Sequence, residues 1–176
     1  MSDPQDGTTA EDGPGPGTGA EGIDFAVLAY REEGAWQVGE VPAHALADLD
    51  AVATELRRWP GDHGTLGLVS VDEDFFVLVR VSGAHTRVLL SDITAATDWP
   101  LARQAVEFLE LPVPEDEDDS APAGDLGIVD DLGMAAMDMG VLIDDYDLYP
   151  DEMLSTVAEK LGFGPAFDDA VGLSLA

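Results

Sequence analysis

The sequence predicts an α+β domain, in which an antiparallel five-stranded sheet with the element order ββαβββα precedes a C-terminal helical segment. One observation behind this prediction is a series of apolar runs of strand length. A second is that every link between the predicted strands is short except the one that contains a helix, as antiparallel neighbours allow. The chain also has enough apolar residues for the core of one ordinary domain, since 45% of its 176 residues are hydrophobic.

The first two strands are predicted to form a hairpin. The run "IDFAVLAY" (Ile23 to Tyr30) begins abruptly after a polar stretch, and "REEG" forms a turn into "AWQVGEV". A helix is expected next, between His44 and Trp59, because its apolar residues recur at steps of three and four. The expected buried stripe consists of Leu46, Leu49, Ala53 and Leu56.

Three further strands are predicted in the runs "TLGLVSV", "FFVLVRV" and "TRVLLSD", which form a meander. The middle run has apolar residues on both faces, so we expect it to be a central strand covered on both sides. Its two faces carry Phe75, Val77, Val79 and Val81 on one side and Phe76 and Leu78 on the other.

Arg80 is the one charged residue within this middle run, and Asp24 has a comparable place in the first strand. If the two strands pair, an Arg80 to Asp24 contact is expected; otherwise Arg80 extends toward solvent at a sheet edge. Both interpretations are structural. Trp36, Trp59 and Trp99 are likewise expected in the core or at its rim.

Helices are predicted after the meander. Ser91 or Asp92 caps a helical turn, and a helix is expected from Pro100 to Glu110. The region from Leu126 to Phe167 is also predicted to be helical, most clearly from Pro150 onward, where carboxylates favour the helix start and Gly162 marks its end. The stripe of this last helix consists of Met153, Leu154, Val157, Ala158 and Leu161.

Composition divides the chain into four predicted regions. Residues 1–22 are a Gly, Pro and carboxylate tail that buries too little to be ordered, and residues 23–111 are the sheet domain. Residues 112–125 are an acidic linker flanked by prolines, and residues 126–176 are the C-terminal helical segment. The linker contains the run "EDEDD", which we interpret as a solvated strap with an electrostatic role at most.

The charge balance argues against direct nucleic-acid binding. The chain has 37 Asp and Glu against 7 Lys and Arg, a net charge of -30, and scattered cations that form no basic stripe. A basic protein partner is the natural complement of such a surface; the alternative is a general compositional bias toward carboxylates. The absence of Cys and of an apolar leader or spanning run predicts a cytoplasmic protein without disulfides or membrane contact.

No catalytic, cofactor-binding or metal-ligating residues are predicted. His44, His63 and His85 share no ligand spacing, and the serines lack the small-residue elbow of a hydrolase nucleophile. The stretch Asp144 to Glu152 has calcium-like carboxylate spacing, but an EF-hand loop counted from Asp145 would place a proline at position six, where glycine is required. Helix-start charges explain this stretch better than a calcium site.

A family resemblance is carried by four features in order: "FAVLAYREEGAWQV", "DFFVLVRV" followed by "RVLLSDITAA", the acidic gap, and "LYPDEMLSTVAEKLGFG". Together, over Ile23 to Gly172, they resemble the actinobacterial tRNA adenosine deaminase-associated proteins. This resemblance implies an association with the enzyme that makes inosine in the tRNA anticodon. It implies no catalytic role and supplies no site residues.

The sequence excludes the deaminase activity itself, because zinc deamination needs two or three Cys ligands and this chain has no Cys. The function predicted is therefore a non-catalytic accessory or regulatory protein that contacts a tRNA adenosine deaminase or another basic protein. One alternative is a self-associating structural module with no direct role in tRNA modification. Another is an enzyme that uses only carboxylates, Arg and Tyr, although the sequence shows no convergent set of these residues.

Overall fold

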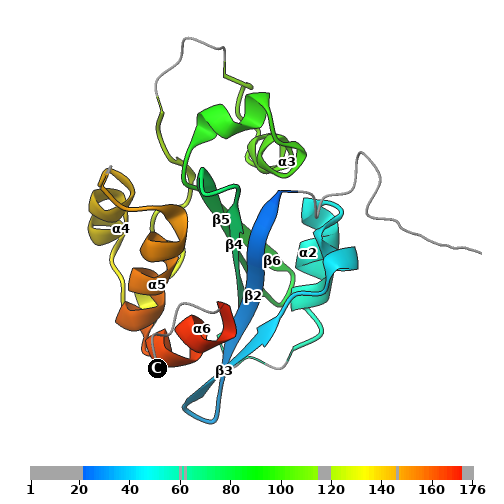
Figure 1. The fold of residues 1–176 in the computed structure, drawn as a ribbon. Coiled ribbons are helices and arrows are strands. Elements are labelled where there is room, and N and C mark those ends of the chain that lie inside the picture. The colour runs from blue at the N-terminus through cyan, green and yellow to red at the C-terminus, as the bar shows by residue number, and fades with distance from the viewer. Residues whose placement is uncertain (1–21, 60, 62, 115–119, 146, 172–176) are drawn as a thin grey trace, which may run out of the picture.

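The computed structural model describes residues 22–171 except 60, 62, 115–119 and 146. The predicted disordered tail lies outside this part apart from Gly22, as does the "EDEDD" run. The described residues form one antiparallel sheet with helices against both of its faces (Figure 1). The α+β class with an antiparallel sheet is confirmed, and the arrangement of helices makes three layers.

The sheet has six strands rather than the predicted five, in the order β3-β2-β4-β5-β6-β7, and every neighbouring pair is antiparallel. The predicted hairpin and the predicted meander are both present. Their strands are β2 (Ile23–Glu32), β3 (Ala35–Glu40), β4 (Thr65–Val71), β5 (Phe75–Ser82) and β6 (His85–Leu90).

The additional strand, β7 (Ala123–Gly124), lies within the range predicted as linker and pairs with Leu90 and Leu89 of β6. Two residues are too few to show the alternation by which a strand is predicted. Gly124 has a φ of 109°, and a Cβ there would collide with the carbonyl oxygen of Val88. Glycine therefore allows this edge to form, and β7 attaches the chain to the sheet before the C-terminal helices begin.

One face of the sheet is covered by four elements, which are η1 (Ala43–Leu46), α2 (Leu49–Leu56), η2 (Ile93–Thr97) and α3 (Pro100–Phe108). The prediction of a single helix between His44 and Trp59 is wrong in one respect, because a break in the chain direction separates η1 from α2. Asp48 has an extended backbone at this break, and its carboxylate accepts a hydrogen bond from the Ala51 amide at 2.7 Å. An Asp in this conformation marks the start of a helix, so α2 begins anew after Asp48. The break allows both η1 and α2 to pack on the sheet.

The opposite face is covered by η3 (Asp130–Leu132), α4 (Ala136–Ile143), α5 (Pro150–Leu161) and α6 (Gly164–Val171). All five residues of the predicted stripe in α5 are buried. Gly162 ends α5 in the left-handed conformation, and α6, which was not predicted as a separate helix, starts two residues later. Phe167 of α6 is fully buried and packs edge-on against Phe25 of β2.

The middle strand of the meander is central, as predicted. β5 lies between β4 and β6, and seven of its eight residues are buried. Phe75 and Val77 face the layer of α2 and α3, whereas Phe76 and Leu78 face the layer of α4 to α6. The alternation of side chains thus contributes to both cores at once.

Arg80 does not contact Asp24, so that prediction is wrong. β4 lies between their strands, and Asp24 accepts hydrogen bonds from Ser70 and the Glu73 amide. Arg80 instead donates to the carbonyl oxygens of His63 and Ile128 and forms a two-pronged ion pair with Asp131. This buried guanidinium therefore ties β5 to the C-terminal layer.

A second arginine makes the same kind of connection. Arg87 of β6 lies directly opposite Arg80 in the β5 to β6 register, pairs with Asp125, and donates to the carbonyl oxygen of Gly127 at 2.8 Å. The two arginines hold the beginning of the C-terminal segment along one face of the sheet.

Trp36 and Trp99 pack at the rim of the core, as predicted, whereas the prediction is wrong for Trp59, which is exposed. The indole N–H of Trp36 donates to the Leu161 carbonyl oxygen at 3.0 Å, and its ring lies 4.7 Å from that of Phe163. Trp59 packs on Tyr30, and Trp99 on Phe75. Trp36 joins the edge strand β3 to the end of α5, which is a further tie between the sheet and the C-terminal helices.

Candidate protein-docking surface

The arginines of this chain make contacts within the molecule. Each of the six arginines has an intramolecular partner, and several of these partners are neutral carbonyl, hydroxyl or aromatic groups. Those contacts are Arg31 on the Trp36 ring, Arg57 on Thr86, Arg58 on Glu55, Arg80 on Asp131, Arg87 on Asp125 and Arg103 on the Ala96 carbonyl oxygen. Few of the carboxylates are therefore neutralised, and the surface keeps a strong negative field.

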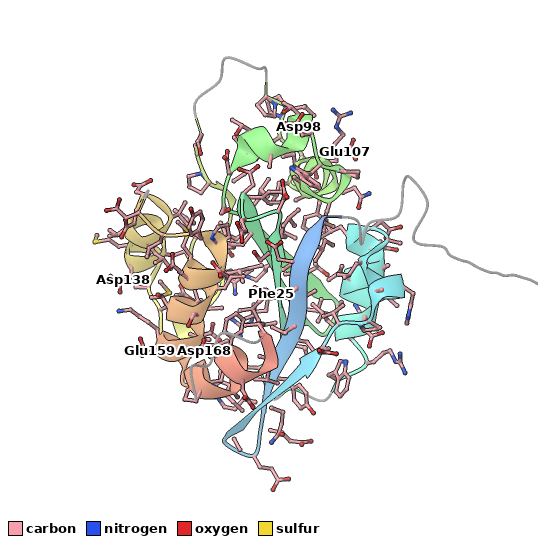
Figure 2. The ribbon with its side chains drawn as sticks, viewed as in Figure 1. Phe25, Asp98, Glu107, Asp138, Glu159 and Asp168 are labelled. Carbon is pink, nitrogen blue, oxygen red and sulfur yellow. The ribbon has the colours of Figure 1, made fainter. Side chains whose placement is uncertain are left out.

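The negative charge gathers at one end of the sheet, where β4 turns into β5. We call this region the acidic end and define it by Asp72, Asp74, Asp92 and Asp98. It lies at the upper end of the sheet in Figure 1, and Figure 2 labels Asp98 there beside α3. The four carboxylates come from a turn and from both ends of η2.

The local sequence explains why these residues lie here. Asp72 and Glu73 both have φ values near 53°, the left-handed conformation of the tight turn between β4 and β5. Asp92 caps η2, since its carboxylate accepts hydrogen bonds from the amide and the hydroxyl of Thr94. Asp98 is the residue that ends η2. Turn and cap chemistry thus brings four carboxylates together.

The pKa of Asp74 is raised in these surroundings. Partial burial of the carboxyl group raises this pKa above its ordinary value, and the negative charges of Asp92, Asp72 and Asp98 raise it further. Every charged group that shifts Asp74 is itself a carboxylate. A cationic group brought to this place would relieve the repulsion, so the acidic end favours a basic ligand.

A groove of about 180 Å³ opens beside the acidic end. Both layers of the protein contribute to it, because Asp74 and Asp92 come from the sheet side and Asp145 and Tyr149 come from the entrance to α5. Tyr149 is 60% exposed, and Leu148 and Met153 add apolar surface. An acidic groove with an accessible aromatic ring suits the aliphatic stem and charged head of a Lys or Arg side chain.

The groove also includes Ser120, the residue that follows directly after "EDEDD" in the sequence. Five carboxylates, residues 115–119, thus precede a groove-lining residue in the chain, and they lie outside the described residues.

A larger groove of about 580 Å³ separates α2 from α3 on the other layer. Its charges are mixed, with Asp50 and Glu107 opposite Arg57. Two of its polar side chains already serve the fold, because Asp48 caps α2 and Gln104 accepts from the Leu49 amide at 2.6 Å. This groove has less uncompensated charge than the acidic end, and we regard it as the weaker candidate for a basic partner.

The histidines lie in three separate elements: His44 in η1, His63 in the loop before β4, and His85 at the start of β6. Within the described residues, no group of three or more His, Asp or Glu side chains is arranged to hold a metal ion. Asp145 and Glu152, from the stretch with calcium-like spacing, bond instead to the backbone amides of Asp147 and Tyr149. These carboxylates shape the turn into α5.

Three of the serines have identifiable structural partners. The Ser91 hydroxyl accepts a hydrogen bond from the Phe76 amide at 2.9 Å, Ser70 donates to Asp24, and Ser155 donates to Asp168 at 2.6 Å. Each of these hydroxyls serves an end of a strand or a contact between helices.

Comparison with known proteins places the chain in a family. A family model described as "Rv3753c-like tRNA adenosine deaminase-associated protein" matches residues 24–164, and the chain belongs to this family. This confirms the resemblance given by the sequence. The match runs from β2 through α5, so it includes the strands, the acidic end and both arginine ties.

A relative in Mycobacterium tuberculosis (strain ATCC 25618 / H37Rv) is Protein Rv3753c. It is 42% identical over 142 residues, which cover 79% of this chain and 82% of that protein. The search of solved structures found no significant match. In the part of the chain that the structure describes, no helix is long and apolar enough to cross a membrane.

Sequence reasoning did not find the acidic end. The four carboxylates are separated by up to 26 positions, and nothing in their spacing indicates that they meet. A usable signal was present in the polar turn "DED" between two strongly apolar strands and in "SD" directly after the next strand. In an antiparallel meander these two positions fall at the same end of the sheet.

Proposed function

We propose that this protein is a non-catalytic accessory protein that binds a tRNA adenosine deaminase by direct contact, with the acidic end as its docking surface. Membership of a family named for association with that enzyme supports the partner. The observation that supports the surface is the cluster around Asp74, whose pKa is raised first by partial burial of the carboxyl group and then by the negative charges of Asp92, Asp72 and Asp98.

Charge complementarity between the two proteins supports this docking. An enzyme that holds tRNA needs a basic surface, because it must neutralise backbone phosphates. An acidic protein is attracted to such a surface from a distance, which raises the association rate and makes the complex sensitive to salt. The same field repels RNA, so direct contact of this chain with tRNA is not part of the proposal.

A non-catalytic role agrees with the chemistry of the chain. It has no Cys, so it lacks the ligands with which deaminases hold zinc. Several of the polar groups that line the two grooves, among them Asp48, Asp92 and Asp145, serve caps and turns of the fold. We place the protein in the cytoplasm, beside an enzyme of tRNA modification.

Co-purification tests this function. The protein and the deaminase from the same organism are mixed at micromolar concentrations in about 50 mM salt and again in about 300 mM salt. We expect a complex at the lower concentration that weakens at the higher one. A clean failure to associate at low salt contradicts the proposal, and a stable homodimer that ignores the deaminase supports the self-associating module instead.

A further inference from the structure

The helix α4 has apolar residues on both of its faces. Met139, Leu142 and Ile143 are buried against the rest of the C-terminal layer. On the opposite side, Met137 is 80% exposed and Val141 is 67% exposed, and these two residues lie one turn apart on one face. Neighbouring exposed apolar side chains on one helix face are typical of a surface that a partner covers, and α4 lies at the outer edge of the molecule (Figure 1).

Gly140 lies on the same exposed face and is not needed by the fold. It is inside α4, where glycine is a poor helix former compared with alanine. A Cβ at this position would meet only the Leu126 side chain at 3.9 Å, which is an ordinary contact. Its backbone has no positive φ. Glycine leaves the half-buried flank of the stripe, beside Met137 and Val141, without a side chain, so another backbone can approach closely there.

The face has the periodicity of a helix-packing stripe. Met137, Gly140, Val141 and Asp144 are spaced at i, i+3, i+4 and i+7, the positions that one helix presents to another. Asp138 and Asp144 are both exposed beside or on the stripe. Figure 2 labels Asp138 at the outer side of α4.

The charge of this region decides what can cover the stripe. The sequence has no Lys or Arg between Arg103 and Lys160, and none of the ion pairs found among the described residues includes Asp138 or Asp144. The residues outside the described part also contain no Lys or Arg, so they cannot supply one. A second copy would bring the same carboxylates to the contact. The occupant with complementary charge is a basic segment of another protein.

The C-terminal end of α4 leads to the groove beside the acidic end. Ile143, the last residue of α4, is on the buried face of the helix, and it lines that groove together with Asp145, which follows α4. A segment that lies along α4 therefore has the groove beyond the C-terminal end of the helix.

We propose that the outward face of α4 docks a basic amphipathic helix of the partner protein. The apolar side of that helix packs on Met137, Gly140 and Val141, and its Lys or Arg residues pair with Asp138 and Asp144. This inference rests on the proposed function, because the partner it assigns is the deaminase.

Two substitutions and one control test this inference on the full-length protein. Met137→Ser removes apolar surface from the stripe, and Gly140→Ala adds a methyl group where close approach is required. Val113→Ser is the matched control, since Val113 is 42% exposed but lies outside α4. The affinity of each variant for the deaminase is measured by titration calorimetry, and its thermal midpoint by circular dichroism.

We expect Met137→Ser and Gly140→Ala each to weaken binding about tenfold, and Val113→Ser to leave it unchanged. Gly140→Ala should raise the thermal midpoint while it weakens binding. A purely structural glycine would not produce these opposite effects, because its loss would lower the midpoint.

Each other outcome overturns the inference. If the wild-type protein binds and both α4 variants bind equally well, docking on α4 is wrong and the proposed function stands. If the wild-type protein does not bind the deaminase, the inference and the proposed function fail together. If the α4 variants instead disrupt a homodimer, the stripe is covered by a second copy and the basic partner is wrong.

Discussion

Asp131 of η3 and Asp74 of the turn before β5 both lie next to this central strand, and their pKa values move in opposite directions. The hydrogen-bonded ion pair with Arg80 lowers the pKa of Asp131 to about 2, in spite of some burial. Partial burial raises the pKa of Asp74, and the neighbouring carboxylates raise it further. One carboxylate has a cation inside the fold and the other does not.

The opposite pKa shifts distinguish carboxylates that form ion pairs within the fold from carboxylates that remain available to a partner. Arg80 and Arg87 use Asp131 and Asp125 to hold the C-terminal layer against the sheet. With only 7 Lys and Arg in the chain, few cations are left for other carboxylates. The acidic end is therefore held together against its own repulsion by turns and caps, which indicates a surface that becomes more stable when a basic partner arrives.

The largest expected effect comes from removing the cation of the compensated pair. Arg80→Met leaves Asp131 and the carbonyl oxygens of His63 and Ile128 without their donor, and it should lower the free energy of unfolding by about 3 kcal/mol. Urea denaturation measures this change. The control is Arg58→Met, because the Arg58 side chain is 69% exposed and its pair with Glu55 should contribute less than about 1 kcal/mol. Equal losses in both variants would contradict a structural role for the Arg80 tie.

The contribution of the Arg80–Asp131 ion pair should also appear in the pH dependence of the free energy of unfolding. The pKa of Asp131 is about 2 in the folded protein and near 3.8 in the unfolded chain, so its ionised form favours folding. The stability difference between wild type and Asp131→Asn should be fully present above pH 3.8 and should disappear as the pH falls from there toward about 2. Because half of the Asp131 side chain is exposed, we expect a difference of only about 1 kcal/mol at neutral pH. A difference that grows on acidification would contradict this assignment.

The linker carboxylates should affect association but not folding. Replacing residues 115–119 with Ser and Gly removes five negative charges that directly precede Ser120, a residue of the acidic groove, in the sequence. We expect the association rate with the deaminase to fall several-fold, up to about tenfold, at low salt. Stopped-flow mixing measures the rate, and thermal unfolding should show no change. If the rate is unaffected, the run is only a spacer.

The smallest effect is expected from Asp74 alone. Asp74→Asn removes a charge that its neighbours repel, so the isolated protein should become more stable at neutral pH by about 0.5 kcal/mol, since this carboxyl is mostly hydrated. Because the folded pKa is raised, this gain should vanish as the pH falls and Asp74 becomes protonated. Urea denaturation at neutral and acidic pH measures it. A loss of stability at neutral pH would show that the charge of Asp74 has a favourable partner in the fold.

The sequence predicted those parts of the fold that depend on local pattern. The alternation in β5 and the stripe of α5 each repeat over several residues, so each could be recognised without knowledge of the rest. The break at Asp48 could not, because an Asp in a helical pattern caps a new helix only where packing favours a change of direction. β7 is two residues long, and its position depends on Gly124 and on the edge of β6.

Contacts between residues far apart in the sequence could not be predicted from local sequence pattern. Arg80 was recognised as unusual, but its partner Asp131 is 51 residues away, across the acidic linker. Asp74 and Asp145 of the acidic groove are likewise far apart in the chain and meet only because the C-terminal layer lies on the sheet. The candidate site is therefore a product of tertiary structure, whereas the family and the class of fold could be predicted from the sequence.

The most direct test of the account compares the deaminase affinity of the wild-type protein with that of a charge-removed acidic end. Asp72→Asn, Asp74→Asn and Asp92→Asn are combined in one variant, in which Asn at position 92 can still cap η2. The control removes as many exposed carboxylates elsewhere, by Glu40→Gln, Glu159→Gln and Asp169→Asn. Figure 2 labels Glu159 at the opposite end of the molecule from Asp98.

Titration calorimetry in about 50 mM and about 300 mM salt gives the affinity of each form. We predict that the acidic-end variant binds at least about tenfold more weakly than the control at low salt, and that its affinity depends less on salt. Equal affinities for the two variants, with equal salt dependence, would contradict docking at the acidic end.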